Sequence, residues 1–173
     1  HPNSHNIIEG TPSERRVFLD WGLFHVEQDF KRAWANYTKI LKQRNEALKL
    51  RDQSEATWLK KLAPAGELIS SMREGYLKGL QQHLEEVGRY IMPNLDLTFS
   101  YEKGWDDKKT LSDALNDKKQ LDADKGFTSV GPQNANIKIM LNGREAQKIC
   151  SRGQQKLIAN IMLLSQSKDF YEK

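Results

Sequence analysis

Several features are scarce or missing in this sequence of 173 residues. The single cysteine, Cys150, excludes an intrachain disulfide framework and fits a reducing compartment. No apolar run approaches the roughly 20 residues that a membrane-spanning helix needs. The chain also lacks an initiator methionine and a secretory signal peptide. We therefore expect a cytoplasmic protein without membrane contact, and we interpret both abrupt ends as those of a fragment of a longer protein.

The composition is that of a folded, charge-rich chain. Hydrophobic residues make up 38% and charged residues 29%, and the aromatic side chains are spread through periodic apolar patterns, which argues against disorder. The length suits about one domain with a sizeable core.

Positive charge is concentrated in one segment. The net charge of the chain is +4, but residues 30–61 carry +6 and the rest of the chain −2. The basic residues of this segment are Lys31, Arg32, Lys39, Lys42, Arg44, Lys49, Arg51, Lys60 and Lys61. A basic stripe on one helix is typical of a surface that follows DNA phosphates, although a solvated helix face gives the same pattern.

Helix signals dominate the first half of the chain. Residues 11–14 form a capping box with proline at the first helical position, which predicts a helix running toward Gly22. Residues 28–50 carry a heptad-like apolar stripe, and a second striped helix is predicted to start near Glu55 or after Pro64 and to reach about residue 92. The first stripe is Phe30, Trp34, Tyr37, Leu41 and Leu48; the second is Ile69, Met72, Tyr76, Leu80, Leu84, Val87 and Ile91. Two such helices predict an antiparallel hairpin in which each covers the stripe of the other.

Beyond residue 93 the periodicity changes. Alternating apolar residues predict strands at 95–101 and 137–141, with a short amphipathic helix at 108–124 between them. Asn142-Gly143 is a strong hairpin signal and predicts that residues 146–150 return as a partner strand. A final helix contains Leu157, Ile158, Ile161, Met162 and Leu164. The expected fold class is mixed α/β and predominantly α-helical.

The segment around residue 151 carries the clearest functional pattern. Ser151 is placed to cap the final helix, with Gln154 at the third helical position. Helix N-termini offer unpaired N–H groups and the positive end of the helix dipole, which suit phosphate. The candidate ligand-binding residues are Ser151, Arg152, Gly153, Gln154, Gln155 and Lys156. An ordinary capping box gives the same spacing.

Three stretches together resemble one protein family. Residues 151–156, Ser-Arg-Gly-Gln-Gln-Lys, look like the signature motif of ABC-type ATPases. With residues 10–27 and 41–48, and with Gly131-Pro132 ahead of the signature, they resemble the RecF family of bacterial DNA replication and repair proteins. The resemblance implies a helical lid, or arm, formed by the hairpin and joined to part of an ATPase head. It also implies three parts: a head–lid junction at 1–26, a lid at 27–128, and a returning head segment at 129–173.

The RecF resemblance implies a function and a set of ligands. It implies a recombination mediator that acts in gap repair, replication restart and the SOS response by helping to load recombinase. A Walker A loop and a Walker B aspartate would lie outside the chain, which has no G-x-x-x-x-G-K-[ST] motif. The complete protein would then be a slow DNA-dependent ATPase that uses ATP and Mg²⁺, with residues 151–156 meeting the ATP of a second subunit, whereas the chain alone would not hydrolyse ATP.

The implied partners are nucleic acid and proteins. They comprise double-stranded DNA, single-strand/double-strand junctions, RecR, RecO and, in an ATP-dependent homodimer, a second copy of the protein. The candidate DNA-binding residues, expected on an outward helix face, are Lys31, Lys39, Lys42, Arg44 and Lys49. The alternatives are a non-enzymatic helical-hairpin interaction module and the arm of another SMC-like ATPase. One stretch departs from the family: at residues 131–136, neutral amides replace ionisable residues.

The remaining candidates are given structural roles. His1, His5, His25 and His83 have no metal-ligand spacing, so no metal site and no catalytic group are predicted. His25 is expected in the core.

Asp20 and Arg16, one helical turn apart, are expected to pair, although they could instead join the lid to the head. Trp21 and Trp34 are expected in the core, and Cys150 as a small buried residue; Trp58 and Trp105 are left open between core and base stacking.

Overall fold

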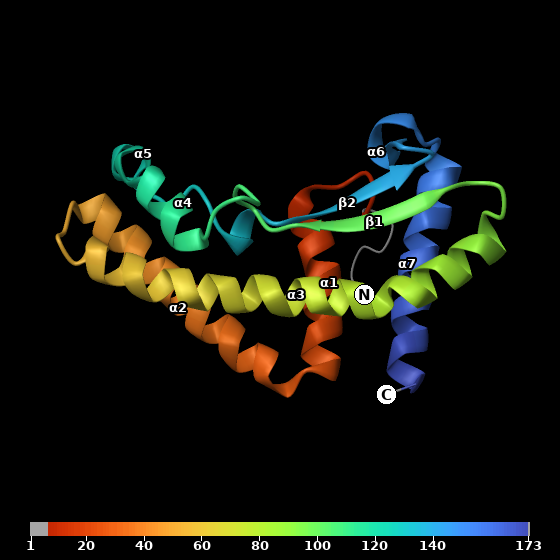
Figure 1. Ribbon diagram of the computed structural model, residues 1–173, viewed down its shortest axis with the longest axis horizontal. Coiled ribbons are helices and arrows are strands. Elements are labelled where there is room, and N and C mark those ends of the chain that lie inside the picture. The colour runs from red at the N-terminus through yellow and green to blue at the C-terminus, as the bar shows by residue number, and fades with distance from the viewer. Residues whose placement is uncertain (1–6, 173) are drawn as a thin grey trace. The chain divides into compact units, whose positions relative to one another are not determined.

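The structure is a computed structural model that describes residues 7–172. Its helices are α1 (Pro12–Val26), α2 (Gln28–Leu50), α3 (Glu55–Ile91), α4 (Leu111–Asp117), α5 (Lys119–Lys125), α6 (Ala146–Ile149) and α7 (Arg152–Glu172). Its strands are β1 (Leu97–Glu102), β2 (Asn136–Leu141) and β3 (Arg144–Glu145), and a 3₁₀ helix, η2 (Pro132–Asn134), precedes β2. The chain is mostly helical with a small sheet, as the sequence predicts (Figure 1).

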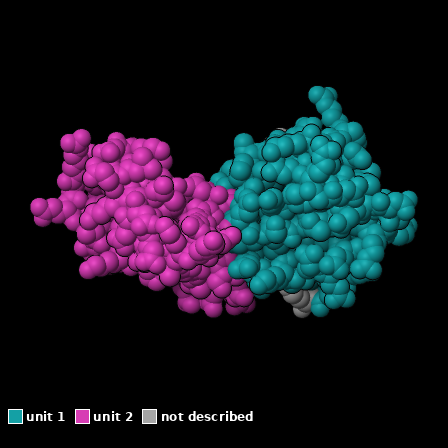
Figure 2. All heavy atoms as spheres, turned by 45° about the horizontal axis from the view of Figure 1, so that its top comes forward, with its two compact units in different colours: residues 1–26, 73–102, 136–173 teal, residues 27–72, 103–135 magenta. Residues whose placement is uncertain are grey.

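Two compact units make up the chain (Figure 2). Unit 1 comprises residues 1–26, 73–102 and 136–173, and unit 2 comprises residues 27–72 and 103–135. Each unit is assembled from segments far apart in the sequence, and α3 contributes to both because the division after Met72 falls inside it. The continuous domains expected from the sequence stay a prediction.

Unit 1 is built around an antiparallel sheet in the order β1-β2-β3. Phe99 lies opposite Ile139 in the register of β1 and β2, and alternate residues of β2 are buried, so the predicted strands are confirmed. Helix α1 packs against β2 and against α7. The core of this unit includes Phe18 and Leu19 of α1 and Ile158 of α7, all at most 1% exposed.

The hairpin turn between β2 and β3 forms where the sequence predicts it. Asn142 and Gly143 both have positive φ angles, 51° and 74°, which is the backbone of a tight two-residue turn. The predicted partner strand at residues 146–150 is wrong. β3 ends at Glu145, and buried Ala146 begins the short helix α6, which packs against β2. A single helical turn buries Ala146 as well as strand alternation would, so periodicity alone could not separate the two.

Unit 2 contains the hairpin of α2 and the first part of α3. Arg44 of α2 bonds to Glu55 at the start of α3, whereas a Cβ on Gly66 further along α3 would lie 3.3 Å from the ring of Tyr37. Contacts that run in opposite directions along the two helices define an antiparallel pair. Helix α3 starts at Glu55 and contains Pro64 within its length, which settles the alternative starts left open by the sequence.

The predicted stripe of α2 is partly buried. Phe30, Tyr37 and Leu48 are at most 4% exposed, but Trp34 and Leu41 are only half-buried. Ile40 and Ala47 are buried instead, because the buried face of α2 is rotated slightly away from the predicted apolar stripe. Trp21 in α1 is also half-buried, so the core placement expected for both tryptophans holds only in part.

Two helix boundaries differ from the sequence prediction. Glu14 accepts a hydrogen bond from the backbone N–H of Thr11 at 2.7 Å, which confirms the start of α1, but the helix continues beyond Gly22 to Val26. The helix expected at 108–124 is two short helices, α4 and α5, because Lys118 leaves helical geometry between them.

Candidate functional site

The N-terminus of α7 is closed by a reciprocal capping box. The hydroxyl oxygen of Ser151 accepts a hydrogen bond from the N–H of Gln154 at 3.3 Å, and the side-chain oxygen of Gln154 accepts one from the N–H of Ser151 at 3.0 Å. The predicted cap is therefore present. It fixes the direction of the first helical turn, where the N–H groups of Arg152 and Gly153 have no acceptor within the helix.

The candidate residues 151–156 differ in their access to solvent. Ser151, Arg152, Gly153 and Lys156 are exposed, and Gln154 is half-buried. Gln155 is only 9% exposed, and its amide nitrogen donates to the carbonyl of Cys150 at 3.1 Å. The chain thus presents five of the six predicted residues on one accessible helix end, with Gln155 turned inward.

The charge around this helix end favours an anion. Arg152 and Lys156 flank the first turn of α7, and this turn contains no acidic residue. The positive end of the helix dipole adds to their field. Burial raises the pKa of the half-buried Cys150 thiol, which keeps this neighbour of Ser151 neutral. These residues fit a phosphate group of a nucleotide.

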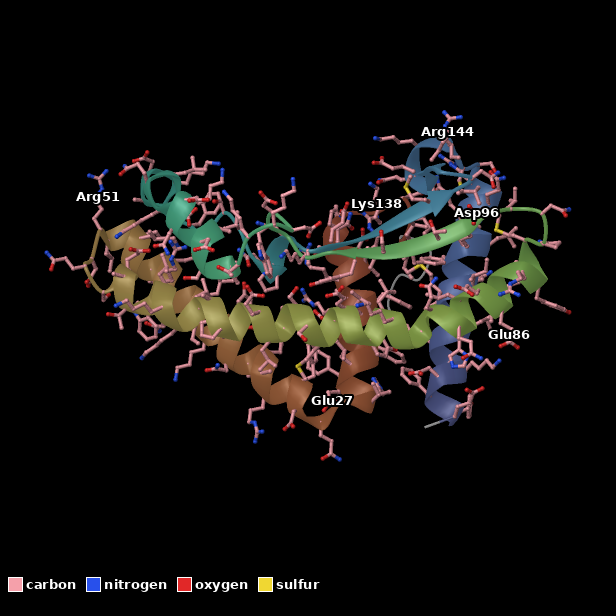
Figure 3. The ribbon with its side chains drawn as sticks, viewed as in Figure 1. Glu27, Arg51, Glu86, Asp96, Lys138 and Arg144 are labelled. Carbon is pink, nitrogen blue, oxygen red and sulfur yellow. The ribbon has the colours of Figure 1, made fainter. Side chains whose placement is uncertain are left out.

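Four of the five predicted DNA-binding residues share one outward face of α2. Lys31, Lys39, Lys42 and Lys49 are exposed, and we call them the lysine face. At 3.6 residues per turn they fall within about 80° of one another around the helix axis, opposite the buried side. Lys49 is 3.1 Å from the carboxylate of Glu46, an exposed pair that holds it only weakly. Beyond them, Arg51 ends the helix and points away from the ribbon (Figure 3).

Arg44, the fifth predicted DNA-binding residue, is buried, and its expected exposure is wrong. Its side chain has no exposed surface. Its guanidinium donates to Glu55 at 2.9 Å, to Asp122 at 2.8 Å and to the hydroxyl of Thr128 at 2.8 Å. A buried arginine needs such partners, because an unpaired charge in the interior is very costly. Arg44 therefore belongs to the interior of unit 2.

A second buried arginine bonds to Asp20. Asp20 accepts two hydrogen bonds from Arg73, at 2.7 and 2.8 Å, and its charge also acts on Arg16, so the pairing predicted with Arg16 stays a prediction. Burial is the largest single influence and lowers the pKa of Arg73, but the hydrogen bond and negative charge of Asp20, together with Tyr101, outweigh it and leave the pKa raised. This bidentate pair ties α1 to α3 within unit 1.

The amide residues that replace ionisable groups in residues 131–136 make internal hydrogen bonds. Gln133 accepts from the hydroxyl of Tyr37 and donates to the carbonyl of Val130 at 3.0 Å. Asn134 donates to the carbonyl of Ser129, and Asn136 accepts from Arg15 at 2.7 Å. Gln133 and Asn134 therefore hold backbone carbonyls in place, whereas Asn136 bonds to other side chains.

The remaining aromatic and histidine predictions have mixed outcomes. His25 is exposed and lies against Trp21 and Phe170, so its expected core position is wrong. Trp105 is buried and donates from its indole N–H to the carbonyl of Lys109, whereas Trp58 is half-buried beneath Lys61.

No metal centre and no membrane span emerge from the part of the chain that the structure describes. Within residues 7–172, no three His, Cys, Asp or Glu side chains are grouped so that they could hold an ion, and no helix has the length and apolarity to cross a bilayer. His1 and His5 lie outside the described residues.

Sequence reasoning missed the partners of Arg44. Phe30, Tyr37 and Arg44 follow one another at intervals of seven, which places Arg44 on the buried stripe, and this spacing could have revealed its burial. Asp122 and Thr128 lie more than 70 residues further along the chain, where no local pattern connects them to Arg44.

Curated relatives match almost the whole length of the chain. No protein-family model matches the chain. The chain is 40% identical over 169 residues to the DNA replication and repair protein RecF of Pseudomonas paraeruginosa, and 39% identical to that of Pseudomonas syringae pv. syringae. Both alignments cover 96% of the chain and 46% of the relative, so the chain spans about half the length of the curated relatives it matches.

Two solved structures of RecF are also similar to the chain. A structure of the recombination mediator protein RecF with ATPγS in the RecFOR pathway superposes with a TM-score of 0.90 at 25% identity, covering 99% of the chain and 50% of that protein. A RecF–ATP structure superposes with a TM-score of 0.89 at 26% identity, covering 97% of the chain and 49% of that protein. The fold is that of a segment of an ABC-type ATPase. The predicted resemblance to RecF is confirmed: the chain is homologous to RecF over about half of RecF's length.

Proposed function

We propose that the chain is part of a RecF-type recombination mediator that binds ATP and DNA, dimerises when ATP is bound, and helps to load recombinase at gaps in DNA. One observation carries this proposal: an exposed, capped helix N-terminus with the sequence Ser-Arg-Gly-Gln-Gln-Lys, in a chain homologous to RecF. The protein acts in gap repair and replication restart, in the cytoplasm, and it responds to DNA damage.

The ATP-dependent step depends on the helix end of α7. Ser151 orients the first turn, and the N–H groups of Arg152 and Gly153 would hold the terminal phosphate of a nucleotide bound to a second subunit. Arg152 and Lys156 supply positive charge there. Bound ATP contributes the anion that these donors recognise, and Mg²⁺ and the Walker motifs belong to parts of the protein outside this chain. ATP hydrolysis is slow and ends the dimer.

The DNA-dependent step depends on the lysine face. Its four lysines are exposed on one side of one helix, where their ammonium groups could neutralise several phosphates of a duplex. The partners of the protein are duplex DNA, single-strand/double-strand junctions, RecR and RecO.

Charge reversal on the lysine face tests the DNA part of this proposal. We expect Lys42→Glu with Lys49→Glu, in the full-length protein, to weaken duplex binding and to flatten the dependence of log affinity on log salt by about 0.9 for each phosphate that is no longer neutralised. A control with the same change in net charge, Lys78→Glu with Lys148→Glu, reverses two exposed lysines of unit 1 and should keep the wild-type slope. Equal affinities of the wild-type and Lys42/Lys49 proteins at low salt would contradict a DNA surface on α2.

A further inference from the structure

One exposed aromatic side chain lies beside the lysine face. Phe127 follows helix α5 and is 48% exposed. Helix α5 packs against α2 within unit 2 (Figure 1). A Cβ on Gly126 would lie 3.4 Å from Cγ of Lys49, and the backbone N–H of Thr128 donates to Asn45 of α2 at 2.8 Å. Phe127 therefore sits between two residues that are both in contact with the helix that carries the lysine face.

The backbone on both sides of Phe127 is firmly anchored. Gly126, with a φ of 74°, ends α5 in the left-handed conformation, and its N–H donates to the carbonyl of Asp122 at 2.8 Å. The carboxylate of Asp122 accepts from the N–H of Ser129 at 2.9 Å and from Arg44 at 2.8 Å. The buried network centred on Arg44 thus fixes the backbone of the turn that carries Phe127, so that its exposed ring forms a platform on an ordered backbone.

The surroundings of the ring are cationic. Nζ of Lys125 lies 5.8 Å from the centroid of the Phe127 ring. Cγ of Lys49, whose Nζ pairs with the exposed carboxylate of Glu46, lies 3.4 Å from the position of a Cβ on Gly126. A protein partner that buried an apolar anchor here would have to desolvate these ammonium groups, whereas DNA supplies phosphates for them. Unpaired bases stack on aromatic rings without regard to sequence, and nearby cations bind the backbone that carries them. Paired bases inside a duplex do not offer their faces.

We propose that Phe127 stacks on an unpaired base where duplex DNA held by the lysine face gives way to a single strand, so that this ring recognises the junction. This inference rests on the proposed function, because it requires the lysine face to bind the adjoining duplex. Arg44, Asp122 and Thr128 act as positioning residues that hold the turn. Lys125 pairs with the phosphate next to the stacked base.

The test compares two DNA molecules and two substitutions. Binding of the full-length protein to a gapped duplex and to a continuous duplex of the same length is measured by fluorescence anisotropy. Phe127→Ala should lower affinity for the gapped duplex at least about fivefold, the lower end of what base stacking contributes, and leave affinity for the continuous duplex unchanged. Phe127→Trp should keep the preference for the gap, and its indole fluorescence should be quenched by the gapped duplex alone. Phe24→Ala, which removes an exposed phenylalanine of unit 1, should change neither affinity.

The outcomes separate this inference from the proposed function. Equal losses on both DNA molecules, an unchanged affinity for the gapped duplex, or an unquenched Phe127→Trp would overturn the junction platform. If the Lys42→Glu, Lys49→Glu protein still loses affinity for both molecules, the lysine face stands and only the role of Phe127 fails. If that protein binds both normally, the DNA surface on α2 and the platform beside it fail together. Thermal unfolding of each variant confirms that the exposed ring was removed without loss of the fold.

Discussion

Arg44 and Asp122 form an ion pair 2.8 Å long, with both side chains fully buried and 78 residues apart in the sequence. Glu55 completes the neutralisation from the other side of the guanidinium. The pair joins α2 to the short helix α5, so it positions the turn at residues 126–129 within unit 2. Arg44, whose charge suggests contact with DNA, is instead buried beneath the helix that carries the proposed DNA surface.

Removing one member of the Arg44–Asp122 pair should lower the free energy of unfolding far more than removing a surface charge. Asp122→Ala leaves Arg44 buried with too few partners, and breaking a buried pair in this way costs about 3–5 kcal/mol of unfolding free energy. Glu46→Ala, which removes the exposed partner of Lys49, should cost less than about 1 kcal/mol. Urea denaturation followed by circular dichroism measures both. Similar losses for the two variants would show that Arg44 is not buried as described.

Two glycine-to-alanine substitutions should have opposite effects. In α1, a Cβ on Gly22 would lie 2.1 Å from the hydroxyl oxygen of Tyr76 and 2.5 Å from the side-chain nitrogen of Gln166, two buried groups that are hydrogen-bonded to each other. Gly22→Ala should therefore destabilise the protein by about 1–3 kcal/mol through overpacking. In α3, a Cβ on Gly75 meets nothing within 4 Å, so Gly75→Ala should stabilise the protein by up to about 1 kcal/mol. Melting temperatures of the two variants should move in opposite directions, and a stabilised Gly22→Ala would contradict the packing of α1 against α3.

Sequence patterns predicted the local structure correctly where all the interacting residues lie close together in the sequence. The capping boxes at Thr11 and Ser151 and the turn at Asn142-Gly143 depend on residues within four positions of one another, and all three form as predicted. The long helices were also predictable, because one apolar stripe specifies each of them. Even Pro64 inside α3 did not end it.

Long-range pairing was not predictable from one sequence. Nothing local indicates that Asp20 bonds to Arg73, which lies 53 residues away, because only the packing of α1 against α3 brings the two side chains together. The exposure of His25 and the burial of Arg44 were missed because residue type suggests the opposite environments. For Arg44, the seven-residue spacing from Phe30 and Tyr37 was a local signal of burial that the charge of the residue outweighed.

The most direct test of the proposed function is whether ATP brings two copies together through Ser151. The full-length protein, Ser151→Arg and the control Ser13→Arg, which changes an exposed serine in the first turn of α1, are compared by sedimentation velocity with and without ATP, and nucleotide binding is measured for each. Arginine at position 151 removes the cap of α7 and places bulk where a phosphate of the second subunit's nucleotide must lie. We predict that the wild-type and Ser13→Arg proteins dimerise with ATP, whereas Ser151→Arg binds ATP but remains monomeric. Normal ATP-dependent dimerisation of Ser151→Arg would contradict the role proposed for this helix end.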